Sequence, residues 1–170
     1  MKSSALPASM LVTLALSAWA TPARALDVDR SYLSHGTANC QAALPVFDGN
    51  IRKRPKAIAN EGTSAAFITC DFENGPNGLR KISGVAIYLK NRSAATAVVN
   101  CTLVQGFGDT QYEANVTKSQ ELAADGEGAL VWTSDDYAGN RLTVPSTSCS
   151  LPPGVEIFGT QLEFPEYVGS

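Results

Sequence analysis

The chain has 170 residues, of which 44% are hydrophobic and 17% charged, with a formal net charge of −3 at pH 7. These proportions are ordinary for a folded globular domain and exclude intrinsic disorder, a collagen-like chain and a coiled coil. The acidic balance argues against nucleic acid or another polyanion as the main partner.

Residues 1–25 have the organisation of a secretory signal peptide. Lys2 supplies a positive charge, residues 10–20 are apolar, and an Ala-Arg-Ala sequence ends at Ala25. The apolar stretch is too short to span a bilayer, and no later stretch approaches the roughly 18 apolar residues that a membrane helix needs. We therefore expect cleavage near Ala25, a secreted or periplasmic protein, and no membrane span.

The rest of the chain predicts a single domain. Its 145 residues carry 11 Lys and Arg against 16 Asp and Glu, a formal net charge of −5. Residues 26–39 have weak hydrophobic periodicity, and we expect an extended N-terminal arm that leads into a domain over 40–170. From residue 57 onward apolar and polar residues alternate, and turn residues interrupt the pattern about every ten positions.

This pattern predicts an all-β fold, an antiparallel β-sandwich of the jelly-roll or immunoglobulin-like type with about eight strands. Alternation places Tyr88 opposite the hydrophobic residues of its strand, groups Phe158 with Leu162 and Phe164, and puts Trp132 in the core. Pro-Pro-Gly at 152–154 suits a type II turn. The expected strands are 57–60, 65–71, 81–90, 98–105, 111–122, 127–133, 146–151 and 155–164.

Four cysteines remain after the expected cleavage, and an even number in an exported protein predicts two disulfides. No Cys-x-x-Cys occurs, and a zinc site would need more histidine than the single His35. Three connectivities are open. Pairing between sequence neighbours gives the simplest topology, so we favour Cys40–Cys70 and Cys101–Cys149.

These cysteines stand in recognisable surroundings, and their combination resembles a broad group of bacterial exported proteins. The resemblance covers residues 40–164 and implies a disulfide-pinned all-β fold and a bacterial source. It implies no activity and carries over no catalytic residues. The segments that carry it are Cys40, AIAN at 57–60, AFITCDF at 66–72, NCTL at 100–103 and SCSLPPG at 148–154.

Several shorter features have an ordinary structural explanation beside a functional one. Four cations lie within 52–56, where they could contact lipopolysaccharide or anionic lipid, but Lys and Pro also protect the edge of a sheet. A catalytic triad would have to use His35, and no Gly-x-Ser-x-Gly elbow is present. Asn91, Asn100 and Asn115 begin Asn-x-Ser/Thr triplets, which would accept glycans only in a eukaryote.

A candidate binding site follows from the direction of the strands. Because strands alternate in direction, the loops 72–80, 106–110 and 134–144 should share one end of the sandwich. We name this end the acidic rim. Its candidate ligand-binding residues are Glu73, Phe107, Asp109, Asp135, Asp136 and Tyr137.

The acidic rim permits several functions. Carboxylates and carbonyls there could hold Ca²⁺, although no cofactor is required, and Tyr137 or Phe107 could stack on a sugar. The first hypothesis is a secreted, non-catalytic module that binds a carbohydrate, a cell surface or a protein partner. The alternatives are a glycosidase-like hydrolase that uses two rim carboxylates, or a secreted inhibitor or toxin-like factor.

Overall fold

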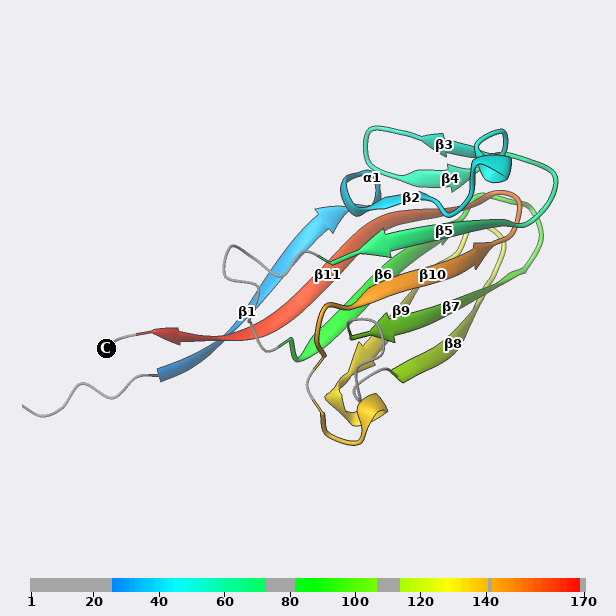
Figure 1. Cartoon of the computed structure of the whole chain (residues 1–170). Helices are drawn as coiled ribbons and strands as arrows, with labels where there is room; N and C mark the ends of the chain where they lie inside the picture. Colours follow the sequence, from blue (N-terminus) through cyan, green and yellow to red (C-terminus); the bar gives the residue numbers. More distant parts are fainter. Residues whose placement is uncertain (1–25, 73–81, 107–113, 141, 169–170) are drawn as a thin grey trace, which may run out of the picture.

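The computed structural model describes residues 26–72, 82–106, 114–140 and 142–168. In this part of the chain eleven strands form two antiparallel sheets that pack face to face (Figure 1), which confirms the expected all-β sandwich. The six-stranded sheet holds β3 (Ile51–Lys53), β4 (Ile58–Asn60), β11 (Val155–Val168), β6 (Gly84–Asn91) and β9 (Glu127–Thr133) in that order, with β1 (Leu26–His35) beside β11. The five-stranded sheet has the order β2 (Cys40–Ala42), β5 (Ala66–Asp71), β10 (Ser146–Leu151), β7 (Ala97–Gln105) and β8 (Ala114–Leu122).

The eight expected strands are all present, and two of them, β9 and β10, have the predicted bounds. The three additional strands, β1, β2 and β3, lie before residue 57. β1 pairs with β11 over ten residues, but most of its side chains are exposed. Its backbone hydrogen bonds therefore hold it in the sheet without the alternation of buried and exposed residues that reveals a strand in a sequence.

Helical structure is confined to short turns. The helix α1 (Gly36–Asn39) follows β1, and the 3-10 turns η1 (Pro45–Phe47) and η2 (Ser134–Tyr137) follow β2 and β9. In the described residues no helix is both long and apolar enough to cross a membrane.

The core lies between the two sheets and is built from the inward side chains of the alternating strands. Trp132 is fully buried, as predicted, and its indole nitrogen donates to the Val116 carbonyl oxygen at 2.9 Å. Ile87 and Leu103, from opposite sheets, are also completely shielded from solvent. Burying side chains of this size is worth about 1.5–3 kcal/mol each, so the core between the sheets contributes much of the stability of the fold.

Both disulfides lie within the five-stranded sheet. Cys40 of β2 is bonded to Cys70 of β5, and Cys101 of β7 is bonded to Cys149 of β10. The members of each pair occupy directly opposite positions in adjacent strands. The favoured connectivity is therefore confirmed.

A β-bulge in β11 changes which residues face outward. The pairing of β11 with β6 shifts between Ile157 and Gly159, so Phe158 is an extra residue on its strand. Ile157 is fully buried, whereas Phe158 is half-buried and lines a surface groove together with Tyr88. The predicted grouping of Phe158 with Leu162 is wrong because a bulge reverses the alternation at the inserted residue.

At the end of the sandwich opposite the acidic rim, the loops are held together by hydrogen bonds. Gly154 adopts φ +79° in the Pro-Pro-Gly turn, as a type II turn requires, and its amide donates to the Asn60 carbonyl oxygen at 2.8 Å. The side chain of Asn91 is completely buried at this end. Its amide nitrogen is therefore not available to accept a glycan in the folded protein.

Candidate functional site

Of the acidic-rim loops 72–80 and 106–110 only the first residues, Phe72 and Gly106, are described, and both contact the segment that follows η2. The Phe72 amide donates to the Pro145 carbonyl oxygen at 3.3 Å, and the Gly106 amide donates to that of Thr143 at 2.9 Å. Of the candidate ligand-binding residues, Glu73, Phe107 and Asp109 lie outside the described residues. Only Asp135, Asp136 and Tyr137 can be placed, and all three belong to η2.

Asp136 is engaged within the fold. Its carboxylate accepts a hydrogen bond from the Thr133 amide at 2.9 Å, closing a capping box at the start of η2, and another from Lys118 Nζ at 2.8 Å. Partial burial opposes its ionisation, but the bonds from Lys118 and Thr133 outweigh that effect and lower its pKa. Asp135, by contrast, is exposed.

Tyr137 is part of the core. It is 5% exposed, and its hydroxyl donates to the Leu103 carbonyl oxygen at 3.2 Å. Burial, together with the negative charge of Asp136, raises its pKa to about 12. The expectation that Tyr137 stacks on a sugar is therefore wrong, because its ring has no open face. Among the described residues, no three His, Cys, Asp or Glu side chains come together as a metal site.

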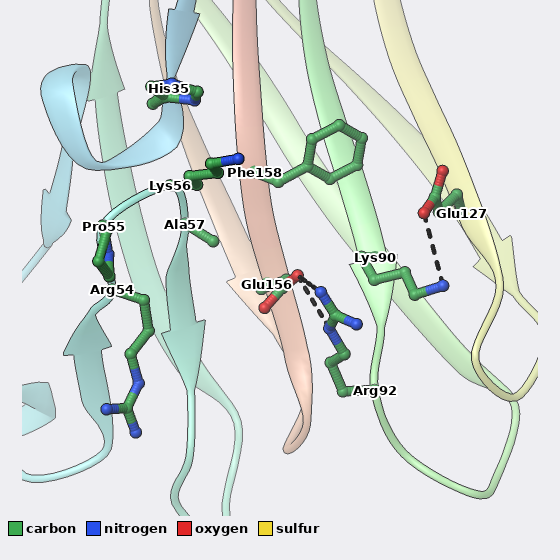
Figure 2. Close-up of a pocket in the computed structure, with 10 residues that line it drawn as sticks. All are labelled: His35, Arg54, Pro55, Lys56, Ala57, Lys90, Arg92, Glu127, Glu156 and Phe158. Atoms are coloured by element: carbon green, nitrogen blue, oxygen red, sulfur yellow. Dashed lines mark hydrogen bonds and ion pairs between the residues drawn. The ribbon is translucent and has the colours of Figure 1, made fainter.

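A groove lies instead on the outer face of the six-stranded sheet, away from the acidic rim. It consists of two adjoining hollows with volumes of about 610 and 470 Å³, and both are lined by His35 and Phe158. We call this surface the sheet groove. Figure 2 shows that its larger hollow lies between β1 and the β3–β4 turn on one side and β6 and β9 on the other.

The floor of the sheet groove is aromatic. Tyr88 points outward because the strand β6 buries Ile87 and Leu89 on its other face, and Phe158 points outward because of the bulge. The centroids of the two rings are 5.9 Å apart, and their planes are inclined by 35°. Gly159 lies beside Tyr88, and a Cβ there would come within 3.3 Å of the ring.

Polar groups on this floor are held in fixed orientations. The Tyr88 hydroxyl donates a short hydrogen bond to Gln161 Oε1, and the Gln161 amide nitrogen donates to Glu163 Oε1 at 2.9 Å. Tyr88 and Gln161 lie on neighbouring strands of the same sheet. Their hydrogen bond therefore holds a hydroxyl and an amide in a fixed orientation beside the rings.

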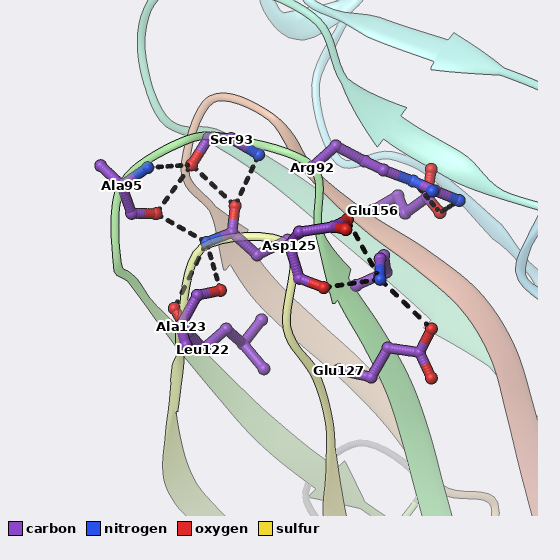
Figure 3. Close-up of polar contacts among 10 residues, drawn as sticks. Arg92, Ser93, Ala95, Leu122, Ala123, Asp125, Glu127 and Glu156 are labelled. Atoms are coloured by element: carbon purple, nitrogen blue, oxygen red, sulfur yellow. Dashed lines mark hydrogen bonds and ion pairs between the residues drawn. The ribbon is translucent and has the colours of Figure 1, made fainter.

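One wall of the sheet groove carries ion pairs between residues in or next to β6, β9 and β11 (Figure 2). Arg92 donates from Nε and Nη2 to Glu156 Oε1, at 3.0 and 2.8 Å. The hydrogen bond and the charge of Glu156 raise the pKa of Arg92 further above its usual value. Lys90 lies 3.1 Å from Asp125 Oδ1 and 3.5 Å from Glu127 Oε1. Figure 3 labels these two acidic residues, Asp125 and Glu127.

The other wall is formed by the turn between β3 and β4. The Arg54 amide donates to the Ala57 carbonyl oxygen at 2.7 Å, and the Arg54 guanidinium makes two hydrogen bonds with Glu61, at 2.7 and 2.6 Å. β3 is the edge strand of its sheet, so the cationic run 52–56 does lie at a sheet edge. Its last residues, including Lys56, also line the sheet groove.

The helix α1 sets the position of His35 at the boundary between the two hollows. Gly36, the next residue, is buried against β11, and a Cβ there would lie 2.2 Å from the Ile157 carbonyl oxygen. Only glycine permits this close approach of two backbones. The backbone next to His35 is therefore packed tightly against β11, while the imidazole of His35 remains exposed.

Sequence reasoning missed the sheet groove as a site. The outward position of Tyr88 was predictable, but its neighbours come from β11, from β1 and from the β3–β4 turn, which are far apart along the chain. The cationic run at 52–56 was the one signal in the sequence. The sequence alone could not predict that this run lies next to the rings of Tyr88 and Phe158.

No protein-family model matches the chain, and no curated protein matches it either. Among solved structures, a xylan-binding module CBM15 is similar over 81% of this chain and 97% of its own, with 14% identity and a TM-score of 0.42. The Podospora anserina GH26-CBM35 β-(1,4)-mannanase is similar over 82% of this chain, with 10% identity and a TM-score of 0.40. The Phanerochaete chrysosporium exo-β-1,3-galactanase is similar over 79%, with 12% identity and a TM-score of 0.39. The chain spans only 28% and 29% of the lengths of these two enzymes.

Proposed function

We propose that this β-sandwich is a carbohydrate-binding module and that its binding site is the sheet groove. The observation that carries the proposal is the neighbouring pair of outward rings, Tyr88 and Phe158, on the floor of an open hollow lined by polar side chains. This location replaces the acidic rim as the proposed site, because Tyr137 is buried there and Asp136 is bound within the fold.

The chemistry of a sugar fits such a surface. A pyranose ring has an apolar face of C–H groups and a periphery of hydroxyls, each of which can donate and accept hydrogen bonds. Aromatic rings bury the apolar face at little cost in side-chain entropy, and a small number of oriented polar groups then selects the hydroxyl pattern. Tyr88 and Phe158 supply the rings, while Gln161, His35 and Arg92 supply hydrogen-bonding groups at the margin of the sheet groove.

The polar groups are preorganised, which favours binding. Tyr88 is joined to Gln161, and Arg92 is joined to Glu156, whose side chain is 11% exposed. Side chains already held in place lose little freedom when a ligand arrives, so more of the contact energy is available as affinity.

The proposal includes the compartment. Two disulfides suit an oxidising environment outside the cytosol. We propose that a bacterium secretes the protein or exports it to the periplasm after cleavage near Ala25. Recovery of a mature protein that begins at residue 26 from the exported fraction would support this, and recovery of the uncleaved chain from the cytosol would contradict it.

The binding proposal is tested by affinity electrophoresis against a panel of soluble plant, algal and bacterial polysaccharides, followed by calorimetry with oligosaccharides of any that retard the protein. We expect Tyr88→Ala and Phe158→Ala each to weaken binding by about tenfold or more, since one lost stacking contact costs on the order of 1–2 kcal/mol.

Phe67→Ala is the matched control. Phe67 is also a partly exposed aromatic residue on a strand, and its ring lies 5.8 Å from that of Phe47, but it belongs to the other sheet. Its removal should leave the affinity unchanged. Absence of retardation by every polysaccharide would refute the proposed function, and loss of binding in Phe67→Ala but not in Tyr88→Ala would refute the proposed site.

A further inference from the structure

Most of the charge in the sheet groove is balanced locally. Its larger hollow is lined by four cations and two carboxylates, and three of the four cations have acidic partners. Arg54 is paired with Glu61, Arg92 with Glu156, and Lys90 with Asp125 and Glu127. These pairs leave little net attraction for another anion.

Lys56 is the exception. It is exposed in the sheet groove, and within the described residues no carboxylate is paired with it. It follows Pro55 in the β3–β4 turn, whose backbone is closed by the hydrogen bond from Arg54 to Ala57. In Figure 2 its ammonium group points into the hollow, in the region between the His35 and Phe158 side chains. An uncompensated positive charge thus stands at the end of the aromatic floor.

We infer, on the basis of the proposed function, that the sheet groove selects a saccharide that bears a negative charge. The sugar ring would rest on Tyr88 and Phe158, and its carboxylate or sulfate group would pair with the Lys56 ammonium. The protein as a whole is acidic, so general attraction of the surface for anions does not explain such a preference. Selection depends on one cation at one place.

The test compares pairs of sugars that share the same ring and differ in whether they carry the negative charge. Oligomers of galacturonate and of glucuronate are each titrated in a calorimeter beside their methyl esters, which retain the ring and lose the charge. A sulfated galactan oligomer beside its desulfated form identifies the acidic group. We expect the charged member of at least one pair to bind about threefold to tenfold more tightly, and the preference to fall as salt is added.

Lys56→Gln should abolish that preference, lowering the affinity for the charged member to about that for its neutral counterpart. Lys53→Gln is the matched control, because Lys53 belongs to the same cationic run but donates to the Thr37 carbonyl oxygen and does not line the sheet groove. Equal losses in both variants, or equal affinity of the wild-type protein for charged and neutral members, would overturn the inference.

The outcomes separate this inference from the proposed function. Binding of neutral sugars that depends on Tyr88, with no gain from a negative charge, would overturn the charged subsite and leave the carbohydrate module intact. No binding of any member, charged or neutral, would refute the module itself and the charged subsite with it.

Discussion

Replacing Asn91 by alanine should be among the most damaging single changes outside the hydrophobic core. The Asn91 side chain is completely buried at the end of β6 and links the turn that follows β6 to residues 122–123. Its partners Ser93, Ala95, Leu122 and Ala123 are labelled in Figure 3. Its amide nitrogen donates to the carbonyl oxygens of Ala95 at 2.7 Å, Ala123 at 3.0 Å and Leu122 at 3.3 Å. Its oxygen accepts from the Ser93 amide at 2.9 Å.

The magnitude follows from counting these partners. Asn91→Ala leaves three carbonyls, the Ser93 amide and the Ser93 hydroxyl without their side-chain partner. A buried polar group without a partner costs about 1–3 kcal/mol. The Ala95 segment is exposed, so water can compensate part of the loss. We expect the free energy of unfolding to fall by about 3 kcal/mol, which for a domain of this size lowers Tm by roughly 6–12 °C.

Urea unfolding followed by circular dichroism measures this loss, and Asn100→Ala is the control. Asn100 is exposed on β7, and its oxygen accepts a single hydrogen bond, from Ser119 Oγ at 2.6 Å. Its replacement should cost less than about 1 kcal/mol. A loss below about 1 kcal/mol for Asn91→Ala, or equal losses for the two variants, would refute the assignment of Asn91 as a structural connector.

Three further predictions concern stability. Removing the second disulfide in Cys101→Ala/Cys149→Ala opens a loop with a sequence separation of 48. By loop entropy this should cost about 4 kcal/mol in non-reducing urea unfolding, and a cost under about 1 kcal/mol would contradict that account. Because the pKa of Tyr137 is raised to about 12, its neutral phenol stabilises the fold below pH 10, and this contribution is lost as pH rises toward 12. The wild-type free energy of unfolding should therefore decline more steeply over this range than that of Tyr137→Phe, and parallel declines would contradict the assignment. Gly36→Ala should lower the free energy of unfolding by about 2 kcal/mol and weaken sugar binding by displacing α1. The control is Gly49→Ala, whose Cβ would meet nothing within 4 Å and which should change neither the free energy of unfolding nor the affinity for sugar, both measured by calorimetry. Equal effects of the two variants would count against the close docking of α1.

The strands that sequence predicted best are those with one face buried and one exposed. In β10 the burial alternates from residue to residue, in β9 it does so from Ala129 onward, and the bounds of both strands were predictable from the sequence. β1 escaped prediction for the converse reason, since its side chains stay largely exposed while its backbone pairs with β11. Hydrogen bonds between backbones do not require particular side chains, so the sequence of β1 contains no pattern that reveals them.

The candidate site divides in the same way. The outward position of Tyr88 and the cationic turn that ends in Lys56 can be read locally, because each depends on neighbours a few positions away. The outward position of Phe158 cannot be read locally. It results from a bulge, in which β11 has one residue more than β6 opposite it, and this depends on how the two strands pair.

Local sequence thus determined the class of fold and most of the strands, because alternation and turn chemistry act over a few residues. It favoured one disulfide pairing of three, and the structure shows that pairing. The order of the strands was decided only in three dimensions. β4, β11 and β6 are adjacent in the sheet although they are remote in the chain, and this order brings Lys56, Phe158 and Tyr88 to one surface. Which strands become neighbours depends on how both sheets bury their inner faces together, a property of the whole packed core that no single segment carries.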